Sequence, residues 1–199
     1  MGLYGILTDP VVGYEELARV MVERGLKIIQ LRMKDVAPGE VISVARAIRE
    51  IVPPGVSFIV NDDPRIAAEV GADGVHLGQE DMPYDRAREI VGPDAIVGLS
   101  THNPDQTGRA CALRPDYIGV GPVWATPTKK NPDPVIGIDG MREMLGLATV
   151  PAVVLGGIDH SNVREVVEGG ARNLCAVRCI NGSRDPGAEI DRLLEAMER

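Results

Sequence analysis

Residues 76–81 read HLGQED, and their histidine and two carboxylates are groups that transfer protons or bind a metal ion. His76 shares a side of its strand-like run with Gly74 and Gly78, so it should point into the interior of the fold. With no second histidine or cysteine nearby, a zinc site is not favoured. We expect a buried, hydrogen-bonded histidine, with proton transfer as the alternative.

A second group of reactive side chains stands on the run LKIIQLRMK at 26–34. Gln30, Arg32 and Lys34 alternate with apolar residues, and successive strand residues point to opposite sides. Arginine offers a planar fork of donors and lysine a point charge, so the run predicts an anion clamp. The alternative is an exposed strand end whose charges form salt bridges.

Carboxylates end two further runs and suggest a magnesium site. Asp62 ends the run at 56–62, and Asp81 follows the run at 72–79. A hard cation such as Mg2+ takes one or two protein carboxylates and completes its shell with water and phosphate oxygens. We assign Asp62 and Asp81 to Mg2+. Asp63 precedes a proline and should cap a helix, while Glu80 should point elsewhere.

The elements that must position these residues follow a regular alternation. Segments with helical spacing, among them 15–25, 40–52 and 162–170, separate short β-type runs, and several end in glycine. Eight βα units in about 200 residues predict an α/β fold, the TIM (β/α)8 barrel, as one compact domain over 1–199, with its chemistry at the carboxyl ends of the strands. The eight runs are 3–9, 26–34, 56–62, 72–79, 95–100, 116–122, 151–157 and 173–180.

The remaining strand ends predict a second anion subsite. Thr126, Thr128 and Lys129 stand in the segment GPVWATPTKKN, which either closes over a phosphorylated substrate or is only a solvent loop. The glycines of GGID at 156–159, followed by AVRCING, are typical of the phosphate site after strands 7 and 8 of a barrel. The alternative is a simple turn.

Composition narrows the class of partner. A net charge of −8, spread along the chain, argues against a nucleic acid or an anionic membrane as the partner. Three cysteines without CxxC spacing predict a reduced, cytoplasmic protein, and no apolar run reaches the roughly 20 residues that cross a bilayer. The sequence leaves the oligomeric state open, and a homo-oligomer is among the states it allows.

Six motifs in order along nearly the whole chain resemble those of the thiamin phosphate synthase family. QLRMK resembles the family's Q-x-R-x-K, VNDD its N-D-D, and GLSTH its G-x-S-x-H. ADGVHLGQED is almost unchanged, DYIGVGPVWATPTKK resembles D-Y-x-G-x-G-P-x-x-x-T-x-T-K, and GGI is shared. Thiazole-tautomerase relatives resemble these enzymes in fold but generally lack the acids of the metal site.

The resemblance implies a TIM-barrel transferase with Mg2+ as cofactor. It would condense 4-amino-2-methyl-5-(diphosphooxymethyl)pyrimidine with 4-methyl-5-(2-phosphooxyethyl)thiazole, giving thiamin phosphate and pyrophosphate through a pyrimidine-methyl cation. Lys129, Arg32, Lys34 and Ser100 would be catalytic, and Asp62 and Asp81 would hold Mg2+. By motif, Gln30, Arg32, Lys34, Asn61, Ser100 and Lys129 would contact the pyrimidine diphosphate, and Thr126, Thr128, Gly157, Val177 and Arg178 the thiazole phosphate. The chain departs from the family where Arg172 and Asn173 replace an Asp-Gly pair and Arg178 replaces a serine.

Other classes of protein fit the same barrel. An aldolase or epimerase acting on a sugar phosphate is one, and a thiazole tautomerase-like enzyme is another. A Schiff-base aldolase needs a desolvated lysine, for which Lys27 and Lys34 are the strand candidates. A non-catalytic sensor of thiamin precursors would bind the phosphates without releasing pyrophosphate.

Overall fold

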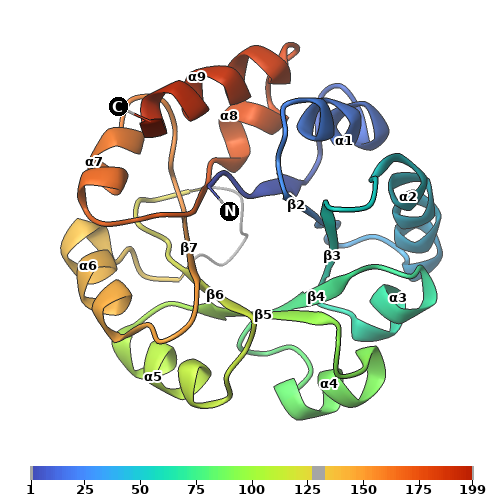
Figure 1. Ribbon diagram of the computed structural model, residues 1–199, viewed down its shortest axis with the longest axis horizontal. Helices are drawn as coiled ribbons and strands as arrows, with labels where there is room; N and C mark the ends of the chain where they lie inside the picture. Colours follow the sequence, from blue (N-terminus) through green and yellow to red (C-terminus); the bar gives the residue numbers. More distant parts are fainter. Residues whose placement is uncertain (1, 127–132, 199) are drawn as a thin grey trace.

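A computed structural model describes residues 2–126 and 133–198, and in this part of the chain eight parallel strands follow one another around a barrel in chain order. Helices surround the ring of strands (Figure 1), which confirms the predicted (β/α)8 barrel. The strands are β1 (Gly5–Leu7), β2 (Ile28–Leu31), β3 (Ser57–Asn61), β4 (Gly74–Leu77), β5 (Ile96–Thr101), β6 (Tyr117–Val120), β7 (Ala152–Leu155) and β8 (Leu174–Cys175).

Helix starts follow local capping chemistry. The Asp63 side chain accepts a hydrogen bond from the Arg65 N–H at 2.8 Å, with Pro64 in the first turn, so its predicted capping role is confirmed. Asn103 caps α5 in the same way. The described helices are α1 (Tyr14–Glu23), α2 (Pro38–Ile51), α3 (Pro64–Glu69), α4 (Tyr84–Val91), α5 (Pro104–Ala112), α6 (Gly137–Leu147), α7 (Val163–Glu168), α8 (Val177–Asn181) and α9 (Pro186–Glu198).

Alternation along the strands creates two apolar cores. Ile29 and Val60 face outward and pack in the layer between strands and helices. Their neighbours Ile28 and Ile59 face inward and belong to a smaller cluster inside the barrel. Parallel strands of a barrel are covered on both faces, and all four residues of β2 are accordingly buried. The inner cluster is Tyr4, Ile28, Ile59, Tyr117, Val153 and Cys175.

The prediction of a strand over 173–180 is wrong beyond Cys175, because Val177–Asn181 forms the short helix α8. A short apolar run cannot be assigned to a strand or a buried helix from periodicity alone. β8 pairs with β7 and meets the start of the chain through a bridge between Leu174 and Leu3. The barrel is therefore closed by few backbone hydrogen bonds at this seam.

Asn181 strengthens the seam with its side chain. Its Oδ1 accepts from the Thr8 N–H, and its Nδ2 donates to the carbonyls of Ile6 and Val177, each at 2.8 Å. The side chain is buried, so the two bonds to Thr8 and Ile6 join α8 to the end of β1 without competition from solvent, and the bond to Val177 lies within α8.

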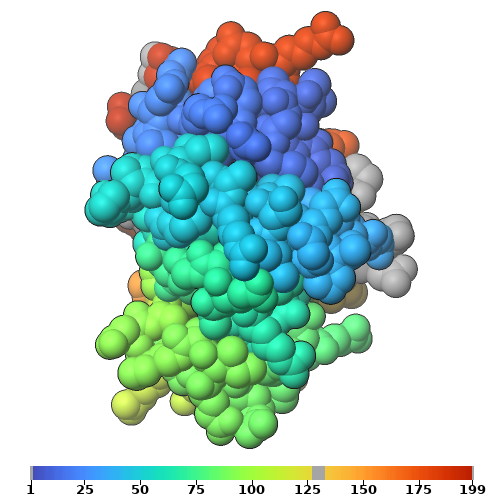
Figure 2. All heavy atoms as spheres, turned by 90° about the vertical axis from the view of Figure 1, so that its right-hand side faces the viewer, coloured from blue at the N-terminus to red at the C-terminus, as the bar shows by residue number. Residues whose placement is uncertain are grey.

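Among the outer helices, α1 packs against α2, α2 against α3, α3 against α4, and α5 against α6, while α9 contacts α1, α7 and α8. Figure 2 shows adjacent bands running from blue to green over one side of the molecule, so successive units lie side by side. No helix in the described ranges has both the length and the apolar character that crossing a membrane requires.

Candidate active site

The carboxyl ends of the strands surround a cavity of about 330 Å³. Thr8 follows β1, Gly121 follows β6 and Gly156 follows β7, so the cavity lies at the end of the barrel where the sequence predicted the chemistry. Of the predicted site residues, the cavity is lined by Gln30, Arg32, Asn61, Ser100, Thr126, Gly157, Val177 and Arg178. The predicted residues Thr128 and Lys129 lie outside the described residues.

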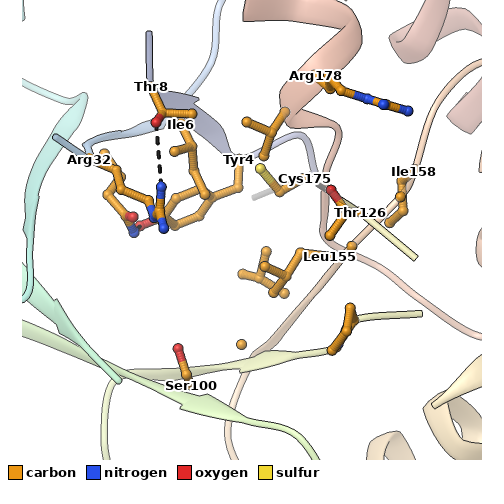
Figure 3. Close-up of a pocket in the computed structure, with 18 of the residues that line it drawn as sticks. Tyr4, Ile6, Thr8, Arg32, Ser100, Thr126, Leu155, Ile158, Cys175 and Arg178 are labelled. Atoms are coloured by element: carbon orange, nitrogen blue, oxygen red, sulfur yellow. Dashed lines mark hydrogen bonds between the residues drawn. The ribbon is translucent and has the colours of Figure 1, made fainter. Parts of the chain in front are cut away.

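Two arginines lie on opposite sides of this cavity (Figure 3). Nη1 of Arg32 donates a hydrogen bond to the Thr8 hydroxyl at 3.4 Å. Arg178 stands across the cavity, on the side of Thr126 and Ile158. A ligand, or a pair of ligands, with anionic groups at both ends would find a cation at each.

Lys34 does not reach the cavity wall. It follows β2 by three positions, its side chain is 47% exposed, and its ammonium forms an ion pair with the Asp62 carboxylate. The predicted clamp is therefore divided, with Arg32 in the cavity and Lys34 at the adjoining rim.

Asp62 and Asp81 meet at this rim. Burial raises the pKa of the Asp62 carboxyl, the Lys34 ammonium lowers it, and the neighbouring Asp81 carboxyl raises it. Asp62 also has a left-handed backbone with φ 69°, which is uncommon for a residue other than glycine and marks local strain. Asp81 Oδ2 accepts from the Gly78 N–H at 2.6 Å, while Glu80 is exposed as expected.

The paired carboxylates fit a divalent cation, whose charge would offset the burial and the Asp81 repulsion that raise the pKa of Asp62. The described residues contain no cluster of three or more histidine, cysteine, aspartate or glutamate side chains able to hold a metal. Mg2+ bound with a phosphorylated ligand needs only one or two protein carboxylates. The donor set present is thus compatible with Mg2+ and incompatible with an all-protein cage.

A chain of five polar side chains crosses the floor of the cavity. Gln30 Nε2 donates to the Tyr4 hydroxyl at 2.9 Å, and the Tyr4 and Tyr117 hydroxyls lie 2.8 Å apart. His76 Nδ1 lies 2.9 Å from the Tyr117 hydroxyl, and its Nε2 lies 2.9 Å from Ser100 Oγ. The expectation that His76 points inward and is hydrogen-bonded is confirmed, although its side chain is only partly buried.

The sequence analysis did not single out Tyr4 or Tyr117. Tyr117 alternates with Gly119 and Gly121, both of which line the cavity, and this periodicity could have placed the ring inside the barrel. Burial raises the pKa of Tyr117 well above the ordinary value for tyrosine, and burial raises that of Tyr4 likewise. Both hydroxyls therefore keep their protons at neutral pH.

His102 is a further cavity residue that the sequence analysis did not assign. Its Nδ1 donates to the Gly121 carbonyl at 2.6 Å, because that oxygen can only accept. Its Nε2 lies 3.2 Å from Asp133 Oδ2. This contact connects the end of β5 to the residue that follows the segment 127–132.

Two glycines after β7 bring the backbone close to the cavity. Gly156 and Gly157 have φ of 102° and 68°, a region that favours glycine. A Cβ on Gly157 would lie 2.7 Å from the Cβ of Trp124, so a side chain would not fit. The backbone of Gly157 can therefore approach a ligand closely.

The departures at positions 172 and 173 lie away from the site. Asn173 accepts from the Gly2 N–H at 2.9 Å and donates to the Ala152 carbonyl at 3.0 Å, which links the segment before β1 and the first residue of β7 to the start of β8. Arg172 is exposed, and neither residue lines the cavity. Arg178 is the departure that reaches the site.

Fold and site together define a class: a (β/α)8-barrel enzyme whose cavity suits small anionic ligands. The family model described as thiamine monophosphate synthase matches residues 4–180, and the chain belongs to that family.

Similar proteins, found by sequence and by structure, carry names of the same family. The chain is 40% identical over 195 residues to the thiamine-phosphate synthase of Gloeobacter violaceus, covering 98% of this chain and 57% of that protein. It is 41% identical over 185 residues to that of Pelotomaculum thermopropionicum, covering 92% of this chain and 85% of that protein. The solved thiamine phosphate pyrophosphorylase from Pyrococcus furiosus is similar with a TM-score of 0.87 at 31% identity, covering 99% of this chain and 95% of that one.

Proposed function

We propose that this chain condenses the pyrimidine diphosphate with the thiazole phosphate to give thiamin phosphate and pyrophosphate. The observation that carries the proposal is the placement of Arg32 and Arg178 on opposite sides of one cavity, in a chain of this family. Two phosphorylated substrates need two separate anion subsites, and this cavity offers a cation at each. The cytoplasmic location stays a prediction from the sequence.

The pyrimidine diphosphate would occupy the side of the cavity formed by β2, β3 and β5. Arg32 would neutralise the diphosphate, with Lys34 and Lys129 adding charge from the rim and from the segment beyond Thr126. Gln30, Asn61 and Ser100 would hydrogen-bond the substrate. The motifs predicted these roles. Gln30, Arg32, Asn61 and Ser100 line the cavity, which supports the roles proposed for these four residues.

Asp62 and Asp81 would hold Mg2+ beside the diphosphate. When bound, the ion neutralises charge on phosphate oxygens and so makes pyrophosphate a better leaving group. Lys34, which pairs with Asp62, supplies a cation at the same rim. The chain's own contribution is to hold both carboxylates together at the end of β3 and in the loop after β4.

The thiazole phosphate would occupy the opposite side. Thr126 and Thr128 would donate hydroxyls, and the backbone at Gly157 and Val177 would approach the phosphate closely. Arg178 would add a guanidinium there, where its side chain borders the cavity.

The chemistry requires no protein nucleophile. The bond between the methylene carbon and the diphosphate oxygen breaks, and the diphosphate leaves with the electron pair. The electron-rich aminopyrimidine stabilises the resulting cation, and the lone pair of the thiazole nitrogen forms the new carbon–nitrogen bond. The enzyme's part is to neutralise the leaving group and to align the two rings.

The rival barrel chemistry is less well supported. A Schiff-base aldolase needs a desolvated lysine. Lys27 and Lys34, the lysines among the described residues, are both exposed and lie outside β2. The facing carboxylates of Asp62 and Asp81 favour a synthase over a tautomerase, because only diphosphate departure needs a divalent cation.

One assay tests the proposal and separates it from a non-catalytic sensor. Both substrates are supplied with and without Mg2+, and pyrophosphate and thiamin phosphate are measured. Arg32→Ala should raise KM for the pyrimidine diphosphate at least about tenfold, and Arg178→Ala should do so for the thiazole phosphate, as the loss of a charged hydrogen bond implies. Arg142→Ala on the outer helix α6 is the matched control. No product with any divalent metal would overturn the proposal.

A further inference from the structure

The five polar side chains on the cavity floor, Gln30, Tyr4, Tyr117, His76 and Ser100, form one continuous hydrogen-bonded chain with both ends at the cavity. Gln30, Tyr4 and Tyr117 are 3%, 2% and 2% exposed. Hydrogen bonds in such a dry interior depend on one another, so the direction of one fixes the direction of the next.

The direction of the chain follows from the Gln30 amide. Its Nε2 can only donate, so the Tyr4 oxygen accepts. The Tyr4 hydroxyl is buried, and of its two side-chain partners only Tyr117 can accept its proton, so that proton points to Tyr117. Tyr117 then donates to His76 Nδ1. His76 must carry its proton on Nε2, which donates to Ser100 Oγ. The Ser100 hydroxyl proton is left to point into the cavity.

The other end of the chain presents an acceptor. In the part of the chain that the structure describes, no buried side-chain nitrogen or oxygen lacks a hydrogen-bond partner. Gln30 uses its Nε2 for the hydrogen bond to Tyr4, and its Oε1 is therefore not a buried atom without a partner but one with accessible surface, where Gln30 lines the cavity. The cavity thus offers the acceptor Oε1 of Gln30 at one end and the hydroxyl proton of Ser100 at the other.

Gly98 on β5 makes room for the Tyr117 ring. A Cβ on Gly98 would lie 2.2 Å from Tyr117 Cζ, whereas a Cβ on Gly119 would only come into ordinary contact with His76 Cε1, at 3.5 Å. The His76 and Tyr117 rings stack with centroids 5.4 Å apart. The backbone therefore leaves each ring a defined place.

We infer that Tyr4, Tyr117 and His76 are positioning residues that set Gln30 as an acceptor and Ser100 as a donor, so the cavity selects a heterocycle with an amino donor beside a ring-nitrogen acceptor. The 4-aminopyrimidine ring has this pattern, and the inference rests on the proposed function for that substrate. A 4-oxopyrimidine presents the reverse pattern, an N–H donor beside a carbonyl acceptor. Accepting it would require every hydrogen bond of the chain to reverse.

The tautomer of His76 tests the inference directly. Long-range ¹H–¹⁵N spectra of the full-length protein should show His76 protonated at Nε2 and unprotonated at Nδ1, with a His76→Gln variant for assignment. Tyr117→Phe should mix the two tautomers. A dominant Nδ1–H tautomer in the unaltered protein would overturn the inference, whatever the activity.

Kinetics and binding distinguish positioning from mere stabilisation of the fold. Tyr117→Phe and Tyr4→Phe should raise KM for the pyrimidine diphosphate about fivefold or more, with kcat and KM for the thiazole phosphate changed less than twofold. Tyr84→Phe on the outer helix α4 is the matched control. Equal changes in all constants would contradict positioning.

Calorimetry with the unphosphorylated 4-amino-5-hydroxymethyl-2-methylpyrimidine and its 4-oxo analogue needs no turnover. The amino compound should bind at least tenfold more tightly, and Tyr117→Phe should reduce that ratio. Binding with this preference but without catalysis would reject only the proposed function. Catalysis without this preference would reject only the inference.

Discussion

Replacing Asn181 with leucine tests how the barrel is closed between β8 and β1. The substitution removes three hydrogen bonds of 2.8 Å and leaves the Thr8 N–H and the Ile6 carbonyl without their side-chain partner. A buried hydrogen bond contributes about 1 kcal/mol net, so the free energy of unfolding should fall by about 3 kcal/mol. In a chain of this length that corresponds to a Tm lower by roughly 6–12 °C.

Urea unfolding followed by far-UV circular dichroism measures the loss. The control is Asn103→Leu, the same chemical change at the exposed cap of α5, where one hydrogen bond to the Gln106 N–H is lost and about 1 kcal/mol is expected. If Asn181→Leu costs no more than the control, the seam does not depend on this side chain. Because α8 carries Val177 and Arg178, the variant should also raise KM for the thiazole phosphate.

Three further predictions concern packing, metal and thiol chemistry. Gly98→Ala should destabilise the protein by about 1–3 kcal/mol in urea because its Cβ would overlap the Tyr117 ring, whereas Gly146→Ala, with open space on α6, should stabilise it by about 0.5–1 kcal/mol. Mg2+ at ten times its Kd should stabilise the wild type by about 1.4 kcal/mol in thermal scans, and Asp62→Asn should abolish this shift. Burial raises the pKa of the Cys179 thiol to about 11, so iodoacetamide should modify it slowly at pH 8 and faster towards pH 11. Because the folded state holds this proton more tightly, the thiol's contribution to stability is complete below its ordinary pKa of 9.0 and is lost as pH rises through about 11. Rapid native-state alkylation at pH 8 would contradict that assignment.

The alternation of strand-like and helical segments was enough to predict the barrel and to place several predicted residues at its cavity. The recurrence of short apolar runs between helical segments gave the eight strands, and the period of two placed Gln30 and His76 inside. Asp63 was separable from Asp62 because a cap before proline has a local signature.

Long-range pairing could not be predicted in the same way. The carboxylate of Asp62 interacts with both Lys34 and Asp81. The three residues follow three different strands, and sequence spacing does not reveal which of the two partners Asp62 contacts more closely. The contact between Tyr4 and Tyr117 joins side chains 113 positions apart, and the space for the Tyr117 ring depends on Gly98, which no local pattern requires. The end of β8 was missed because α8 is as apolar as a strand.

The two apolar cores place different demands on the amino-acid sequence. Residues between strands and helices hold the barrel together, whereas Tyr4, Tyr117, Val153 and Cys175 of the small inner cluster line the cavity. Because neighbouring strand positions such as Ile28 and Ile29 belong to different cores, a substitution at one need not disturb the packing of the other. Single substitutions can therefore change the positions that line the cavity, while the layer under the helices preserves the architecture on which any new specificity would depend.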